Sequence, residues 1–151
     1  MPCPDPRVIV EALALGVVGD RQRGLALLQP IVAEGPAEAY TVLVGLAETA
    51  SKRSRMAYPP GTLFGCEVDS PDGSGSASVD VLPPPRRFAA QFITAIANRD
   101  QDMARALFRA VAEPSDRYGT ADLPEAIGAV YAMAVETCRA VVAEAAREQG
   151  R

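Results

Sequence analysis

The longest regular pattern in this sequence is a stripe of apolar residues from Ile127 to Ala145, spaced three and four residues apart. This spacing places the residues on one face of an α-helix. Asp122 can cap such a helix, Pro124 lies in its first turn, and roughly 25 residues at about 1.5 Å each would extend nearly ~40 Å. We therefore expect one long helix at the centre of the fold. The stripe comprises Ile127, Val130, Tyr131, Ala134, Cys138, Val141 and Ala145.

Shorter segments with the same periodicity lie on both sides of the middle of the chain. Asp5, Asp20 and Asp100 each precede one of them and can cap it through the carboxylate. Two more helices are expected over residues 36–51 and 86–98. Pro30 lies inside the second apolar pattern, where its ring should kink or restart the helix.

Residues 62–82 have a different pattern. Two short alternating segments, 63–68 and 77–82, flank a loop rich in Gly, Ser, Asp and Pro, which predicts a β-hairpin. One face of it would be apolar, and an isolated hairpin is marginal in water, so this face should pack on helices or on another chain. We predict an interaction surface formed by Phe64, Val68, Val79 and Val81, with Cys66 and Ala77 on the same face.

Together these patterns predict a mainly α fold in a single domain over residues 1–151. About six helices would form a bundle or paired helical hairpins, with one β-hairpin inserted near the middle. The N-terminal helices would occupy residues 7–51, the hairpin residues 62–82 and the C-terminal helices residues 86–148.

The two helical halves resemble each other in outline. Val-Ala-Glu occurs at residues 32–34 and 111–113, and Glu-Thr occurs at 48–49 and 136–137. The two repeated sequences are not separated by the same number of residues, and alanine-rich helices produce such matches by chance. The sequence therefore leaves open whether the halves are an internal duplication.

Charge and hydropathy bound the environment of the protein. No apolar run reaches the roughly 18 residues that a membrane-spanning helix needs, and residues 8–18 are interrupted by Glu11. The first residues lack the basic start of a signal peptide. We expect a cytoplasmic protein without membrane contact. A net charge of −4 and a pI near 4.9 argue against nucleic-acid binding unless the cations cluster.

The complete absence of histidine restricts the available chemistry. It removes Ser-His-Asp and Cys-His catalysis and histidine metal ligands. Cys3, Cys66 and Cys138 lie far apart and none belongs to a C-x-x-C pair. The glycines form no phosphate-binding loop. Glu144 and Glu148 lie one turn apart and are interpreted as a solvated face. The sequence predicts no catalytic residues, no metal site and no cofactor.

Five cations flank the predicted hairpin. Lys52, Arg53 and Arg55 precede it, and Arg86 and Arg87 follow it. If the hairpin folds back on itself, its two ends meet and the cations could bind an anion or a nucleic acid. The structural alternative is that Lys52 to Arg55 complement the C-terminus of a helix.

The function favoured by these observations is a non-catalytic interaction or regulatory protein. It would bind a macromolecular partner through its helices or hairpin, or form a homodimer through the long helix. One alternative is a nucleic-acid-binding regulator, using the basic cluster or a helix-turn-helix with Arg21, Gln22 and Arg23 on its second helix. Another is a histidine-free enzyme or small-ligand binder with a pocket between helices.

Overall fold

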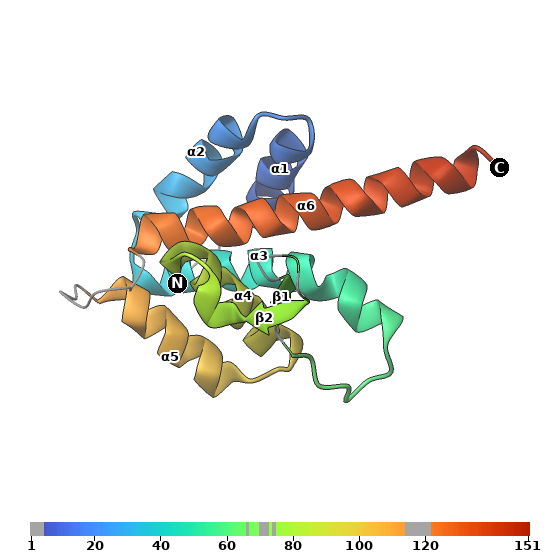
Figure 1. Ribbon diagram of the computed structural model, residues 1–151. Helices are drawn as coiled ribbons and strands as arrows, with labels where there is room; N and C mark the ends of the chain where they lie inside the picture. The colour runs from blue at the N-terminus through green and yellow to red at the C-terminus, as the bar shows by residue number, and fades with distance from the viewer. Residues whose placement is uncertain (1–4, 66, 70–72, 74, 114–121) are drawn as a thin grey trace.

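The protein is mainly helical, as predicted (Figure 1). The computed structural model describes residues 5–65, 67–69, 73, 75–113 and 122–151. Within these ranges the chain forms six α-helices, two short strands and one 3-10 helix. They are α1 (Pro6–Val17), α2 (Arg21–Val32), α3 (Pro36–Ala57), β1 (Glu67–Asp69), β2 (Ser76–Ser78), η1 (Val79–Val81), α4 (Pro84–Ala97), α5 (Gln101–Ala112) and α6 (Leu123–Gln149).

Four aspartates cap helices as the sequence predicts. The carboxylates of Asp5, Asp20, Asp100 and Asp122 accept hydrogen bonds from backbone amides in the first turns of α1, α2, α5 and α6. The helix does not restart at Pro30, because α2 continues through the proline for two more residues to Val32. The proline removes a single backbone hydrogen bond, which the helix tolerates this close to its end.

The predicted hairpin over residues 62–82 is wrong in its extent. β1 and β2 pair antiparallel over three residues each, from Glu67 opposite Ser78 to Asp69 opposite Ser76. The second strand then stops, because residues 79–81 form the 3-10 helix η1. The Ser78 hydroxyl accepts a hydrogen bond from the Asp80 amide at 3.3 Å. This local hydrogen bond favours a turn over continued pairing of the strands. The alternation of apolar and polar residues gives no sign of it.

The core is organised around α3 and α6, which make the largest contact between elements. The two helices run parallel, since Thr137 donates to the Ala50 carbonyl at 3.2 Å and the Arg53–Glu144 ion pair lies further along both. In Figure 1, α1 and α2 lie on one side of α6 and the remaining helices on the other. All six helices contribute buried residues to one apolar cluster.

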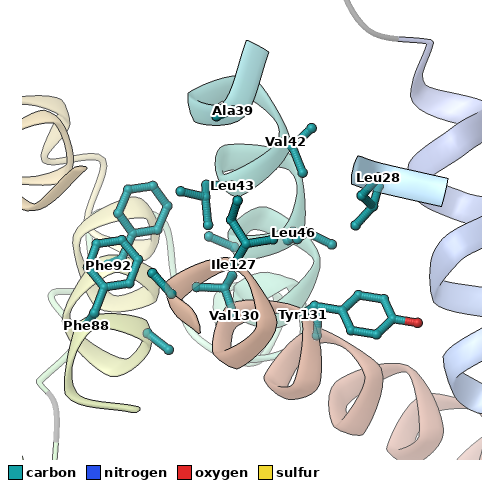
Figure 2. Packing of buried hydrophobic residues seen from close by; sticks show 14 of the residues in the cluster. Leu28, Ala39, Val42, Leu43, Leu46, Phe88, Phe92, Ile127, Val130 and Tyr131 are labelled. Atoms are coloured by element: carbon teal, nitrogen blue, oxygen red, sulfur yellow. The ribbon is translucent and has the colours of Figure 1, made fainter. Parts of the chain in front are cut away.

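The two sides of the core are filled differently. Between α3, α4 and α5 the packing is aromatic: Tyr40 meets the edges of Phe92 and Phe108, and Phe88 stacks on Phe92 with ring centroids 5.3 Å apart. On the other side Tyr131 points away from these rings towards α1 and α2 (Figure 2). α6 therefore connects an aromatic cluster on one face with the α1–α2 pair on the other.

The α1–α2 and α4–α5 pairs share one geometry. Gly19 and Arg99 stand at the ends of α1 and α4 with positive φ angles of 97° and 58°. The next residue, Asp20 or Asp100, donates its amide back to the carbonyl five residues earlier, at 2.8 and 2.9 Å. This pattern is the Schellman motif. Each Asp then caps a helix of 12 residues, α2 or α5.

The third helix of each half also matches. Thr49 and Thr137 donate to the carbonyls of Gly45 and Met133, both at 3.1 Å, and each Glu-Thr pair follows directly on the last two matched buried residues of its helix, Leu46–Ala47 or Ala134–Val135. The two Val-Ala-Glu sequences behave differently. When Asp20 is aligned with Asp100, they are out of register by one residue. Five buried residues of α3, Ala39, Val42, Leu43, Leu46 and Ala47, have the same spacing as Ile127, Val130, Tyr131, Ala134 and Val135 of α6, whereas the buried Ser51 and Ala126 have no buried counterpart. The two halves therefore share their turn geometry and most of the buried pattern of their third helices.

The second half of α6 extends beyond the body of the protein (Figure 1). Val141 of the apolar stripe is 49% exposed there, and its neighbour Val142 is 56% exposed, since no described element covers them. Among the described helices, α6 alone is long and apolar enough to cross a membrane, and 33% of its most apolar window is buried inside the fold. The core helix of a water-soluble protein meets the same criterion. The cytoplasmic location stays a prediction.

Candidate functional site

The described residues offer binding surfaces rather than reactive groups. No three Asp, Glu or Cys side chains among them lie close enough together to hold a metal ion. Cys138 is half-buried against the core, and burial raises the pKa of its thiol, which disfavours the reactive thiolate. Cys3 and Cys66 lie outside the described residues. The features of this protein that can bind a partner are therefore its grooves and exposed patches.

The structure does not bring the five flanking cations together. Lys52, Arg53 and Arg55 lie on the last turns of α3, and Arg55 shares a hollow with Ala97–Arg99 at the C-terminal end of α4. Arg86 and Arg87 lie in the first turn of α4. At about 1.5 Å per residue, α4 separates the two groups by roughly 15 Å. The geometric condition for a single anion site, that both ends of a hairpin meet, is not fulfilled.

Two of these arginines already have partners within the protein. Arg53 forms an ion pair with Glu144 of α6. The Arg87 guanidinium donates to the Leu82 carbonyl at 3.2 Å, which ties η1 to the start of α4. Their charges are therefore partly used in holding helices together.

The predicted apolar hairpin face is also divided. Phe64 lies in the loop after α3, at the C-terminal end of α4, whereas Val79 and Val81 belong to η1, which packs near the start of α4. Val79 is half-buried and Val81 is 51% exposed. Only the backbone of Val68 is described, so its side chain stays outside this comparison. Because residues 79–81 leave the extended conformation, these side chains do not share one strand face.

A groove of about 1010 Å³, open to solvent, lies between α4 and α6. Its walls are mainly apolar and include Leu82, Pro85, Ile93, Ala129, Ala132 and Met133. Charged residues of both signs also line it. The Arg21–Glu136 ion pair, joined by Arg139 at 3.5 Å from Glu136, lies on one side, and Arg86 and Glu125 also line the groove.

No pattern in the sequence pointed directly to this groove. Ala129, Ala132 and Met133 lie off the main apolar stripe of α6, on a second face of the helix. A second run of small and apolar residues on one helix was the available signal. It becomes informative only when the neighbouring helix is known, because the opposite wall comes from α4.

A smaller hollow of about 490 Å³ lies where α3 ends and residues 58–65 cross to the end of α4. The Phe64 amide donates to the Asn98 Oδ1 at 2.6 Å, and the Asn98 Nδ2 donates to the Phe64 carbonyl at 2.9 Å. Two exposed apolar side chains flank it, since Met56 is 77% and Leu63 81% exposed.

Comparisons with protein-family models, curated proteins and solved structures find no match for this chain. The two hollows and the charges around them are therefore the features that bear on function.

Proposed function

We propose that this chain is a non-catalytic interaction protein that binds an amphipathic helix of a partner protein in the groove between α4 and α6. The observation that carries the proposal is the groove itself, about 1010 Å³ in volume, apolar along its walls and open to solvent. Helices dock in grooves of this kind through residues on one apolar face. The lining includes three residues with small side chains, so a second helix can approach closely. They are Ala90, Ala129 and Ala132.

The shape and charges of the groove favour a helix over a small molecule. Small-ligand sites usually bury most of the ligand surface, which a groove open to solvent does not do. The charged groups that line the groove have both signs, with Arg86 and Glu125 beside the Arg21–Glu136 pair. A partner helix whose polar face carries both charges would complement them. A nucleic acid would meet Glu125 and Glu136 as repulsive groups.

The test is capture from the native cell with a matched pair of variants. Met133→Glu places a charge in the groove wall, and Val142→Glu places the same charge on an exposed position of α6 outside it. We expect a partner that the natural protein and Val142→Glu both capture, and that Met133→Glu loses. Partners retained equally by all three proteins would contradict the proposal.

Two further measurements separate the alternatives. Light scattering on the purified protein shows whether the groove binds a second copy, since a particle of 15.9 kDa excludes a homodimer. A titration with short DNA and RNA at low salt tests nucleic-acid binding, whose affinity should fall steeply as salt rises.

A further inference from the structure

We propose that the end of α3 and the loop after it form a second, independent binding site, which takes a partner peptide carrying a carboxylate beside an apolar side chain. The α3-end site is formed by Arg55, Met56, Leu63, Phe64 and Arg99 around the hollow of about 490 Å³. The inference goes beyond the groove between α4 and α6, because the two hollows share no lining residue.

The loop of the α3-end site is held in place from both sides. Asn98, the residue after α4, exchanges two hydrogen bonds with the backbone of Phe64, at 2.6 and 2.9 Å. Thr62 closes a turn by donating its amide and hydroxyl to the Pro59 carbonyl, at 3.2 and 2.6 Å. The Tyr58 ring meets the Phe64 ring edge to face, with centroids 5.8 Å apart. The loop is therefore ordered before any partner arrives, which lowers the entropy lost on binding.

This ordered loop presents apolar side chains to water. Leu63 is 81% exposed, Met56 77% and Tyr58 56%. Single exposed apolar residues are ordinary on protein surfaces, but these three stand together around one hollow or beside it. Tyrosine and methionine are also enriched at protein–protein interfaces.

The charge of the α3-end site is opposite to that of the whole chain. The net charge is −4, yet Arg55 and Arg99 line the hollow and none of its described lining residues is acidic. Within the described residues, no carboxylate lies within ion-pair distance of either guanidinium. Two arginines beside apolar walls complement a carboxylate that sits next to an apolar side chain.

The backbone at Arg99 supplies an independent argument. Arg99 adopts a φ of 58°, a left-handed conformation that disfavours residues with a Cβ. The equivalent turn after α1 has Gly19, with the same pattern of backbone hydrogen bonds. Glycine would therefore satisfy this turn without strain. A strained residue where glycine fits indicates that the side chain has a use, and the Arg99 side chain lines the α3-end site.

A peptide fits this site better than a nucleic acid does. A phosphate backbone is bound by rows of cations that neutralise several phosphates. Here two arginines stand beside a hollow walled by Phe64, Leu63 and Met56, on an acidic protein. Glu48 and Asp100 line a neighbouring hollow on the other side of Arg99 and would repel a continuing phosphate chain.

The test is a selection of random 12-residue peptides displayed on phage against the immobilised full-length protein. We expect enriched peptides to contain Asp or Glu beside Leu, Phe, Met or Trp. Synthesised peptides should bind at least tenfold more weakly to Arg99→Gly and to Leu63→Ser. Arg147→Gln, which removes an exposed arginine from α6, and the groove variant Met133→Glu should leave the affinity unchanged. The Met133→Glu control separates failure of this site from failure of the groove.

Three outcomes would overturn the inference. One is a selection that enriches no acidic peptides. Another is equal affinity of the peptides for Arg99→Gly, which should stay folded because glycine suits the turn; circular dichroism confirms that it does. The third is a single-stranded DNA oligonucleotide that binds more tightly than the selected peptides and loses its affinity in Arg99→Gly, which would assign the site to nucleic acid.

Discussion

At the scale of single residues, Tyr131 explains why α1 and α2 contain glycines inside their helices. The tyrosine hydroxyl is buried and donates to the Ala12 carbonyl at 2.6 Å. A Cβ on Gly16 would lie 2.6 Å from that hydroxyl, and one on Gly24 would overlap it and lie 2.5 Å from the Ala12 carbonyl oxygen. The two glycines therefore make room for the ring between α1, α2 and α6.

We expect Gly24→Ala to lower the free energy of unfolding by about 1–3 kcal/mol, the usual cost of overpacking a core. The matched control is Gly128→Ala in α6, where an added Cβ meets nothing within 4 Å. There the better helix propensity of alanine should raise the free energy of unfolding by about 0.5–1 kcal/mol. Urea unfolding followed by circular dichroism measures both. A neutral Gly24→Ala would mean that Tyr131 is not packed against α2.

The Tyr131 hydroxyl also predicts how stability depends on alkaline pH. Burial raises the pKa of the phenol above its usual value of 10.0; Arg21 opposes this shift and Asp20 adds to it. A pKa that is higher in the folded state gives stability that is complete below pH 10 and is lost as pH rises through the folded-state pKa. Tyr131→Phe should remove this loss while costing about 0.5–1.5 kcal/mol at neutral pH for the hydrogen bond.

The measurement is the urea midpoint of both proteins from pH 8 to pH 11. The difference between the two urea midpoints should narrow above pH 10, since only the natural protein must then keep a phenolate out of the core. The two proteins differ only in the Tyr131 phenol, so the titration of the three cysteines, of Lys52 and of the other tyrosines is common to both and cancels in the difference between their midpoints. A constant difference at all pH values would show that Tyr131 ionises in the folded state as easily as in water.

At the scale of elements, local sequence signals were sufficient for the helices and insufficient for the strands. The aspartate caps and the three-to-four spacing act within one turn, so they can be found without knowing the fold. The end of β2 depends on a hydrogen bond that the Ser78 hydroxyl accepts. The helix α3 continues to Ala57, past its predicted end at residue 51, because its last turns lie along α6. These features depend on partners distant in sequence or on hydroxyl geometry, and periodicity encodes neither.

The two Schellman turns predict substitutions with opposite effects. Arg99→Gly should raise the free energy of unfolding by about 0.5 kcal/mol, because glycine tolerates the positive φ angle of this position. Gly19→Ala should lower it by about 1 kcal/mol, because alanine does not tolerate the φ of 97°. Chemical denaturation of the two variants checks the signs. Destabilisation by Arg99→Gly would show that the Arg99 side chain makes a structural contact, which would weaken the case for its role in binding.

At the scale of the whole molecule, the likeness of the two helical halves was only partly visible in the sequence. The Glu-Thr pairs are in register with the matched buried residues of α3 and α6, whereas the Val-Ala-Glu pairs are out of register with the aspartate caps. The connection between α5 and α6, residues 113–122, is longer than that between α2 and α3, residues 33–35, so no single spacing aligns both halves. The likeness of the two halves is seen in their backbone hydrogen bonds and in the burial pattern of α3 and α6. The grooves depend on this packing and could not be predicted before it was known.

The two helical halves are interwoven, which predicts that neither half folds alone. Tyr131 of α6 binds Ala12 of α1, and Tyr40 of α3 packs on Phe92 of α4, so each half completes the core of the other. A specific protease site inserted at the exposed Gly73 should allow the chain to be cut between β1 and β2 without separating the halves. The cut protein should elute as one particle and unfold in one transition. Each half purified in denaturant should stay largely non-helical alone and regain helical circular dichroism when mixed with the other. A half that unfolds cooperatively by itself would show that α3 and α6 are joined by contact between two finished domains rather than by a shared core.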